Sequence, residues 1–371
     1  MDVVIVGAGT FGSSLAWWLS RAGENVTLVE QFEPGDPRSS SGGETRLLRC
    51  SHGADADYTA MARRAGLLWR QLEAESGKEL VVECGVAWFA RREEGWEAES
   101  ERTLAAQDIP VERLEVANAA RLYPSFRGDD LAFVLLEPEA GVLRAQRAVR
   151  ALVSRAAACG TRIVRGRARP DGDAVALDDS TRLQGDLVVW ACGPWLGGLF
   201  ADLVSLRVTR QEMLFLEGGV PWAGVPAWVD YDGAIYGTGD IDGLGVKAAW
   251  DLEGPPVDAD AELLDTATSE PEVRRYLHQR FPSLSGASLV GARSCRYELT
   301  ADTYFIAAPH PEHPDVWLLG GGSGHGFKHG PAMAERLTRA VTGGEPLPAC
   351  FGLGERSRSR SLRTAGSGRV G

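Results

Sequence analysis

The first thirty residues constrain the fold more tightly than any other stretch of the chain. A short apolar, β-branched run is followed by glycines in the spacing G-x-G-x-x-G, by apolar residues at helical intervals, and by a second apolar run. These parts are residues 3–6, Gly7, Gly9 and Gly12, residues 13–21, residues 26–29, and Glu30, which stands 18 positions after Gly12. The pattern predicts two buried parallel strands joined by a helix, so the chain begins with a complete βαβ unit.

Each residue of this motif has a physical role in binding a dinucleotide. Gly7 permits a tight turn after the strand, Gly9 lets the backbone approach a pyrophosphate, and Gly12 lets the helix pack closely on the sheet. The N–H groups at the start of the helix meet the phosphate charge, and Glu30 can accept hydrogen bonds from a ribose hydroxyl. We therefore predict dinucleotide binding, although the motif does not separate FAD from NAD.

Length, charge and cysteine content narrow the class of protein. A chain of 371 residues is long enough for about two domains or two interleaved lobes. The net charge of −12 argues against a nucleic-acid or anionic-membrane surface, and six scattered cysteines without a C-x-x-C pair indicate neither a zinc site nor a disulfide framework. The first strand begins at residue 3 and no apolar run approaches about 18 residues, so we expect a cytoplasmic protein with no signal peptide and no membrane span.

The order of the strand-like and helical segments indicates two lobes. Buried-strand runs at 186–191 and 316–319 complete the sheet that begins at residue 3, whereas alternating runs between 206 and 292 predict a mostly antiparallel sheet with a helix. The predicted fold class is α/β, with a Rossmann-like lobe made of discontinuous segments and an inserted, mostly antiparallel α+β substrate lobe. We assign residues 1–83, 138–205 and 293–350 to the first lobe, residues 84–137 and 206–292 to the second, and residues 351–371 to a disordered tail. By analogy of fold, this organisation favours a flavoprotein over a simple NAD dehydrogenase.

A second glycine-rich loop, residues 320–330, lies between the last predicted strand and a helix over 331–342. Its glycines Gly322, Gly324 and Gly326 allow close approach of the backbone to a ring system. A reduced flavin carries negative charge at its N1–C2 edge, which the helix N-terminus and Lys328 would stabilise. The alternative is a flexible turn before a terminal helix; the order of strand, glycine loop and helix favours a cofactor loop.

Six segments together resemble the family of monomeric sarcosine oxidase and N-methyltryptophan oxidase, within the D-amino acid oxidase-like flavoproteins. They span roughly residues 1 to 345 and are GAGTFG (7–12), GETRLLR (43–49), YGTGDIDGLGVK (236–247), SCRY (294–297), FI (305–306) and GSGHGFK (322–328). The resemblance implies an FAD-dependent oxidase that acts as a monomer on a small amino or imino acid, with O2 as the second substrate and H2O2 as a product.

The resemblance also implies roles for individual residues. Cys295 matches the cysteine that family members join covalently to the flavin, although a lone cysteine is more often a structural thiol. Arg49 and Lys328 match the pair that holds the substrate carboxylate, and Arg46 matches an arginine near the flavin. Tyr236 and Tyr297 match aromatic residues of the substrate pocket. From local sequence alone, Arg46 and Arg49 would lie on one side of a helical turn, and a plain surface pair is the simpler interpretation.

Lys247 matches the family lysine implicated in oxygen activation on the other face of the flavin. A fixed cation there would stabilise superoxide as it forms. The alternative is a solvated lysine on a strand, but its spacing of eleven residues from Tyr236 is that of the family.

Two positions depart from the family pattern. The pocket histidine four residues beyond the lysine is replaced by Asp251, and the histidine that precedes the arginine segment is replaced by Gly42. A carboxylate at 251 casts doubt on sarcosine itself as the substrate. It resembles the nikkomycin-pathway branch, whose member oxidises the cyclic imino acid piperideine-2-carboxylate, and it would favour a cationic nitrogen. Asp251 is equally interpretable as a solvated loop residue.

Our hypothesis is an oxidase with covalent FAD that oxidises a C–N bond of a small secondary-amine or cyclic amino or imino acid. The competing hypotheses are an FAD-dependent amino acid dehydrogenase that does not use O2, a NAD(P)-dependent dehydrogenase, and a non-catalytic dinucleotide-binding protein. A NAD(P) enzyme has no use for Cys295 or the second glycine loop. We expect no metal site: His325 and His329 are interpreted as loop residues that support the site rather than as ligands.

Overall fold

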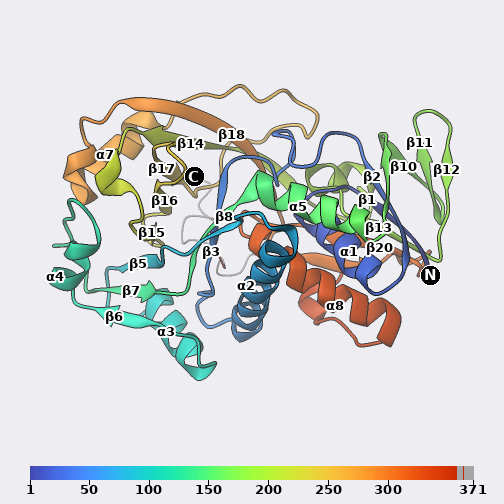
Figure 1. The fold of residues 1–371 in the computed structure, drawn as a ribbon, viewed down its shortest axis with the longest axis horizontal. Helices are drawn as coiled ribbons and strands as arrows, with labels where there is room; N and C mark the ends of the chain where they lie inside the picture. The colour runs from blue at the N-terminus through green and yellow to red at the C-terminus, as the bar shows by residue number, and fades with distance from the viewer. Residues whose placement is uncertain (357–361, 363–371) are drawn as a thin grey trace.

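The two strands of the N-terminal βαβ unit are neighbours in a six-stranded sheet (Figure 1). The computed structural model describes residues 1–356 and 362. In spatial order the strands are β19 (Ile306–Pro309), β20 (Val316–Gly320), β13 (Leu187–Trp190), β1 (Asp2–Val6), β2 (Asn25–Glu30) and β9 (Arg162–Arg165). All neighbours pair in parallel except β19, which runs antiparallel to β20. The sheet therefore joins the start, the middle and the end of the chain.

The alternation of side chains along β1 explains why both faces of this sheet are covered. Val3 and Ile5 belong to a core that includes residues of α1, α2, α5 and α8, whereas Val4 and Val6 belong to a second core on the opposite face. The helices of the first core are α1 (Thr10–Arg21), α2 (Ala56–Ser76), α5 (Ala145–Ala158) and α8 (Gly330–Gly343). The second core includes residues of a small antiparallel sheet and a short helix: β10 (Ala168–Asp171), β11 (Ala174–Leu177), β12 (Arg182–Leu183) and α6 (Leu196–Leu199).

The second lobe is built on an eight-stranded sheet. Its strands, in spatial order, are β18 (Leu289–Leu299), β14 (Arg207–Leu216), β17 (Val246–Trp250), β16 (Ile235–Asp240), β15 (Ala227–Asp230), β5 (Val86–Ala90), β7 (Phe133–Glu137) and β6 (Glu112–Leu114). Only the pairing of β15 with β5 is parallel in this sheet. Three helices accompany it: α3 (Trp96–Ala106), α4 (Val116–Ala119) and α7 (Glu270–Arg280). The sequence prediction of an α/β fold with a mostly antiparallel second lobe is confirmed.

One lobe boundary differs from the sequence prediction. The boundary expected at residue 293 falls inside β18, which pairs with β14 from Leu289 to Leu299 and so belongs wholly to the eight-stranded sheet. In Figure 1 the two long strands run from the second lobe toward the first. The last part of β18 therefore brings residues 295–298 to the junction between the lobes.

A small antiparallel sheet lies at the same junction. It consists of β3 (Thr45–Leu48), β8 (Gly141–Arg144) and β4 (Val81–Val82). The expectation that Arg46 and Arg49 lie on a helical turn is wrong, because β3 pairs with β8 over its whole length and Arg49 follows directly after its end. The glycine pair before β3 gave no local signal for a strand; the pairing partner lies almost a hundred residues away.

The C-terminal residues that the structure describes are packed against the protein. Phe351 is fully buried, and Arg356 donates hydrogen bonds to the Asp302 carboxylate and to the main chain of Tyr304. The backbone carbonyl of Leu362 accepts a hydrogen bond from Arg49 at 3.2 Å. The expected disorder of 351–371 is therefore wrong for 351–356 and 362, and residues 357–361 and 363–371 lie outside the described residues. Among the described residues, no helix has the length and apolar character needed to cross a membrane.

The packing around Gly12 predicts that adding one methyl group there lowers the stability of the protein. A Cβ there would lie 1.9 Å from the carbonyl oxygen of Gly7, inside the turn that joins β1 to α1. We expect Gly12→Ala to lower the free energy of unfolding by about 1–3 kcal/mol, as overpacking does in other cores. The control is Gly343→Ala, because no atom lies within 4 Å of a Cβ at that position in α8. Equal thermal unfolding midpoints for the two variants would contradict the prediction.

Candidate active site

One cavity of about 410 Å³ brings together most of the predicted site residues. It includes the carboxyl ends of β1, β2 and β13, where ligands bind in open parallel sheets, and extends to strands of the second lobe. The predicted residues that line it are Gly7, Gly9, Glu30, Arg46, Arg49, Tyr236, Asp251, Tyr297, Gly322, Gly324, Gly326 and Lys328. Three other predicted residues, Gly12, Lys247 and Cys295, do not line the cavity but lie next to residues that do: Gly7, Tyr236 and Tyr297 respectively.

The N-terminal glycines form one end of the cavity. Gly7 has a φ of 102°, and a Cβ on it would lie 2.4 Å from the carbonyl oxygen of Ala191. The Glu30 carboxylate ends β2 and accepts hydrogen bonds from the backbone N–H groups of Ala8 (2.6 Å) and Phe32 (2.8 Å). Burial raises the pKa of Glu30, and these two N–H groups oppose that effect. Glycine at position 7 thus permits both the positive φ of this turn and its close packing against the backbone at the end of β13.

The second glycine-rich loop lies on the wall of the same cavity. A Cβ on Gly326 would lie 2.7 Å from Cα of Gly322, so the two ends of the loop touch backbone to backbone. Glu298, which the sequence reasoning missed, holds this loop: its carboxylate accepts hydrogen bonds from Gly322 N–H (3.2 Å) and from the Ser40 hydroxyl. No local motif marks Glu298 in the sequence. Only its position next to Tyr297, on the same strand, could have indicated that it belongs to the site.

Arg49 is held by an aromatic ring and a main-chain carbonyl. It is 5% exposed, its guanidinium lies 4.9 Å from the ring of Trp88, and it donates a hydrogen bond to the carbonyl of Ser51. Burial lowers its pKa to about 10, and the charges of Glu137 and Asp251 oppose that decrease. Arg49 is thus a buried cation whose guanidinium reaches the cavity.

Glu137 is a second residue that the sequence reasoning missed. Its carboxylate, at the end of β7, accepts hydrogen bonds from Cys50 N–H (2.7 Å), Ser51 N–H (3.3 Å) and the Trp88 indole (2.9 Å). It therefore fixes the backbone that follows Arg49 from an element almost ninety residues away. A single glutamate before a proline in the sequence gives no sign of this role.

Lys328 is the second cation at this end of the cavity. Its Nζ donates to the carbonyl of His325 at 2.9 Å, and its own carbonyl accepts from the Trp69 indole at 2.7 Å. Burial lowers the pKa of Lys328 well below its usual value, and the charge of Arg49 adds to the decrease. An anion bound beside both residues would reverse part of that shift.

Lys247 is 2% exposed and lies behind Tyr236. Its Nζ donates to the carbonyl and the hydroxyl of Thr45 at 3.2 and 3.4 Å, and it lies 5.3 Å from the centroid of the Tyr236 ring. Burial lowers its pKa to about 7, with a further contribution from Arg46. The alternative of a solvated strand lysine is therefore wrong.

Cys295 and Tyr297 occupy the same face of β18, because they are two residues apart on a strand. Cys295 is 5% exposed and packs with Met213, Phe215, Tyr297 and other apolar residues. Burial raises the pKa of the Cys295 thiol, and the cations of Arg46 and Lys247 oppose that increase. Asp251 is 4% exposed and lines the cavity, so it is not a solvated loop residue.

Comparisons with known proteins identify the family. The profile described as "FAD dependent oxidoreductase" matches residues 2–340. The chain belongs to this family. The monomeric sarcosine oxidase of Streptomyces avermitilis is 31% identical over 364 residues, covering 92% of this chain and 94% of the relative. The predicted family, its FAD cofactor and an oxidoreductase activity are thereby confirmed.

Solved structures show the same fold. L-proline dehydrogenase from P. horikoshii superposes with a TM-score of 0.82 and 19% identity, covering 93% of this chain and 94% of that one. NikD, described as an unusual amino acid oxidase essential for nikkomycin biosynthesis, gives a TM-score of 0.79 and 21% identity, covering 95% and 97%. At these identities the likeness supports the architecture, including the discontinuous first lobe.

The residues present fit FAD. The glycine turn after β1 lines the cavity through Gly7 and Gly9, so no side chain from these two positions covers its backbone N–H groups, as close approach of a pyrophosphate requires. Glu30 lies at the end of β2, at the position where an acid meets a ribose hydroxyl. The second glycine loop and the buried cations lie on the walls of the same cavity, where a flavin ring and its substrate would need them.

The pKa of Lys247 predicts a specific pH dependence of stability. Its pKa is about 7 in the fold and about 10.5 in the unfolded chain. The unfolded state therefore binds more protons between these two values, and stability rises with pH across that window by up to about 1.4 kcal/mol per unit. Lys247→Met removes this contribution, so the wild-type protein should gain stability relative to the variant between pH 7 and pH 9. Denaturant unfolding at each pH measures the difference; parallel curves for the two proteins would contradict it.

Proposed function

We propose that this protein is an FAD-dependent oxidase of small amino or imino acids that contain a secondary amine or a cyclic C–N bond. The observation that carries the proposal is the placement of Arg49 and Lys328, two buried cations, on the wall of the cavity that the dinucleotide motif also lines. Two cations from different elements match a carboxylate, and Arg can bind it bidentately. The sarcosine oxidase relative supports the choice of substrate class.

In this proposal FAD, held by the glycine turn after β1 and the second glycine loop, would supply the two-electron acceptor for oxidation of the C–N bond. Arg49 and Lys328 hold the substrate carboxylate, and Tyr236 and Tyr297 form aromatic walls of the pocket. The substrate loses a hydride equivalent from carbon and a proton from nitrogen to give an imine, and O2 takes up the two electrons and two protons to give H2O2. Lys247 provides a cation close to the cavity wall, and the anionic character of reduced flavin and oxygen would favour its protonated form.

Asp251 supports a cyclic imino acid as a second candidate substrate. It lines the cavity, and its charge acts on Arg49, Tyr236 and Lys328. A carboxylate in this position stabilises a cationic amine or iminium nitrogen better than the family histidine does. Under this alternative, piperideine-2-carboxylate is preferred over sarcosine.

A substrate panel tests the proposed activity. Purified protein is assayed for H2O2 release with sarcosine, N-methyl amino acids, proline, pipecolate and piperideine-2-carboxylate. We expect at least one carboxylate substrate to react and Lys328→Met to raise its KM at least tenfold, because the variant removes a cation from the clamp. Arg147→Met, an exposed substitution on α5, serves as the control. Reduction of an artificial acceptor without H2O2 release would indicate a dehydrogenase instead, and activity on linear substrates alone would rule out the cyclic alternative.

We also propose that FAD is joined covalently to Cys295. The support is its place on the strand face shared with the cavity-lining Tyr297, and the charges of Arg46 and Lys247, which oppose the increase that burial causes in the pKa of the thiol. Acid precipitation of the wild-type protein should leave the yellow colour in the pellet, whereas Cys295→Ser should release it to the supernatant. Cys159→Ser, at the end of α5, is the matched control. Acid-stable flavin in Cys295→Ser would remove this role from Cys295.

A further inference from the structure

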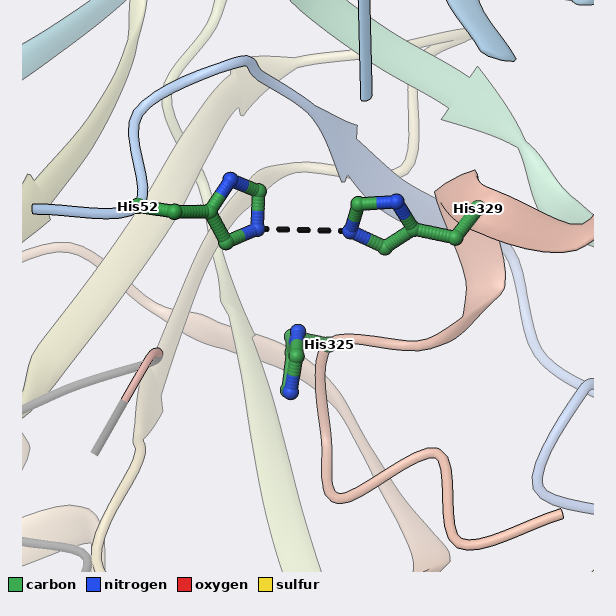
Figure 2. Close-up of side chains that lie close together, drawn as sticks. All are labelled: His52, His325 and His329. Atoms are coloured by element: carbon green, nitrogen blue, oxygen red, sulfur yellow. Dashed lines mark hydrogen bonds between the residues drawn. The ribbon is translucent and has the colours of Figure 1, made fainter. Parts of the chain in front are cut away.

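Two buried histidines join the segments that carry the two cations of the proposed clamp. His52 lies three residues after Arg49, and His329 directly follows Lys328 at the end of a short 3-10 helix, Phe327–His329. Their Nε2 atoms are 3.3 Å apart, and the side chains are 1% and 0% exposed. Figure 2 shows the two rings facing each other across this contact, with His325 lying to one side.

The partners of His52 set the direction of this hydrogen bond. Its Nδ1 lies 2.9 Å from the carbonyl oxygen of Cys50, which can only accept, so Nδ1 bears the proton. Burial, together with the charges of Arg49 and Lys328, lowers the pKa of both His52 and His329 well below the usual value, which keeps both rings neutral. Nε2 of neutral His52 is then the acceptor, and Nε2 of His329 is the donor.

We infer that the His52–His329 hydrogen bond positions Arg49 against Lys328 and thereby tunes recognition of the substrate carboxylate. This hydrogen bond links the side chain of a residue in the segment after β3 to that of a residue in the segment before α8. His52 lies on the same short segment as Arg49, and His329 is the residue next to Lys328. Glu137 fixes the first segment from β7 and Trp69 fixes the second from α2. The hydrogen bond connects these two supports. The inference rests on the proposed function, since it assigns these histidines to the same carboxylate site.

A metal ion is a weaker explanation of the same cluster. Nitrogen atoms of His52, His325 and His329 lie within 4.8 Å of one another, which is close enough for one ion after small movements. The three ligands would all be neutral, and the charges of Arg49 and Lys328 act on the same rings. A buried dication with no anionic ligand and two cations nearby is strongly disfavoured. Neutral, hydrogen-bonded rings have no such cost.

The test compares variants that replace imidazole by an apolar ring of similar size with one variant that keeps an N–H donor. His52→Phe, His329→Phe and the double variant remove the hydrogen bond but fill a similar volume, whereas His329→Gln retains an N–H donor near the Nε2 position. His278→Phe, at an exposed position on α7, is the control. Each protein is prepared with bound FAD. Steady-state kinetics give kcat and KM for the best substrate, and the flavin absorbance change on titration with acetate gives the Kd of a minimal carboxylate without turnover.

We expect each single Phe variant to raise KM and the acetate Kd about tenfold while kcat changes less than threefold. The double variant should show the same tenfold effect rather than a hundredfold one, because both changes remove one interaction. His329→Gln should recover most of the affinity. Unchanged KM and Kd in both Phe variants, additive effects in the double variant, or His329→Gln behaving like His329→Phe would each overturn the inference.

Two further outcomes separate this inference from the alternatives. If the wild-type protein neither oxidises any carboxylate substrate nor binds acetate, the proposed function is wrong, and the inference that rests on it is wrong too. Elemental analysis after incubation with Zn²⁺ alone and desalting tests the metal explanation. Stoichiometric zinc in the wild type that is lost in His52→Phe would overturn the hydrogen-bond assignment. If the Phe variants do not fold, His329→Gln decides the question, since it must bind acetate about as tightly as the wild type.

Discussion

The pairing of β1 with β13 and β2 is the constraint on which the site depends. It requires an apolar strand at the N-terminus that is buried on both faces, and it brings the carboxyl ends of three strands to one edge. β20 then joins through β13, so the second glycine loop reaches the same edge from the far end of the chain. The cavity is therefore a product of long-range pairing, and the segments that line it cannot form a site separately.

The buried cations impose a second constraint on the molecule. Arg49, Lys247 and Lys328, which are buried, and Arg46, which is half-buried, all donate hydrogen bonds to main-chain carbonyls. A carbonyl satisfies the donor but does not neutralise the charge, and burial lowers the pKa of Arg49, Lys247 and Lys328 accordingly. Such an arrangement is costly for the protein alone and is relieved by an anion. The fold thus maintains a region whose electrostatic balance is completed by its ligand.

Residues with a local sequence signal could be predicted, whereas residues held by distant partners could not. The glycines of both loops were found because they stand at a fixed spacing between a strand and a helix, and the Cβ contacts at Gly7 and Gly326 show that the chain packs too closely there for any other residue. Resemblance, rather than spacing, indicated that Arg49 and Lys328 hold a substrate carboxylate. Glu137, Glu298 and His52 were missed because each acts through the backbone or ring of a segment far away in the sequence. The strand at residues 45–48 was missed for the same reason: its register is set by β8, not by its own residues.

The two neutral histidines fit this electrostatic picture. A residue that links the loops of Arg49 and Lys328 must be polar enough to hold a fixed geometry, yet a third charge there would oppose both cations. Carboxylates would neutralise the clamp and compete with the substrate, and apolar residues would leave the loops joined by packing alone. Imidazole meets both requirements, since its neutral form has one donor and one acceptor in a rigid ring. Burial keeps the histidines uncharged, and the cations that attract a substrate carboxylate add to this effect, so the clamp itself helps to maintain the neutral link between its loops.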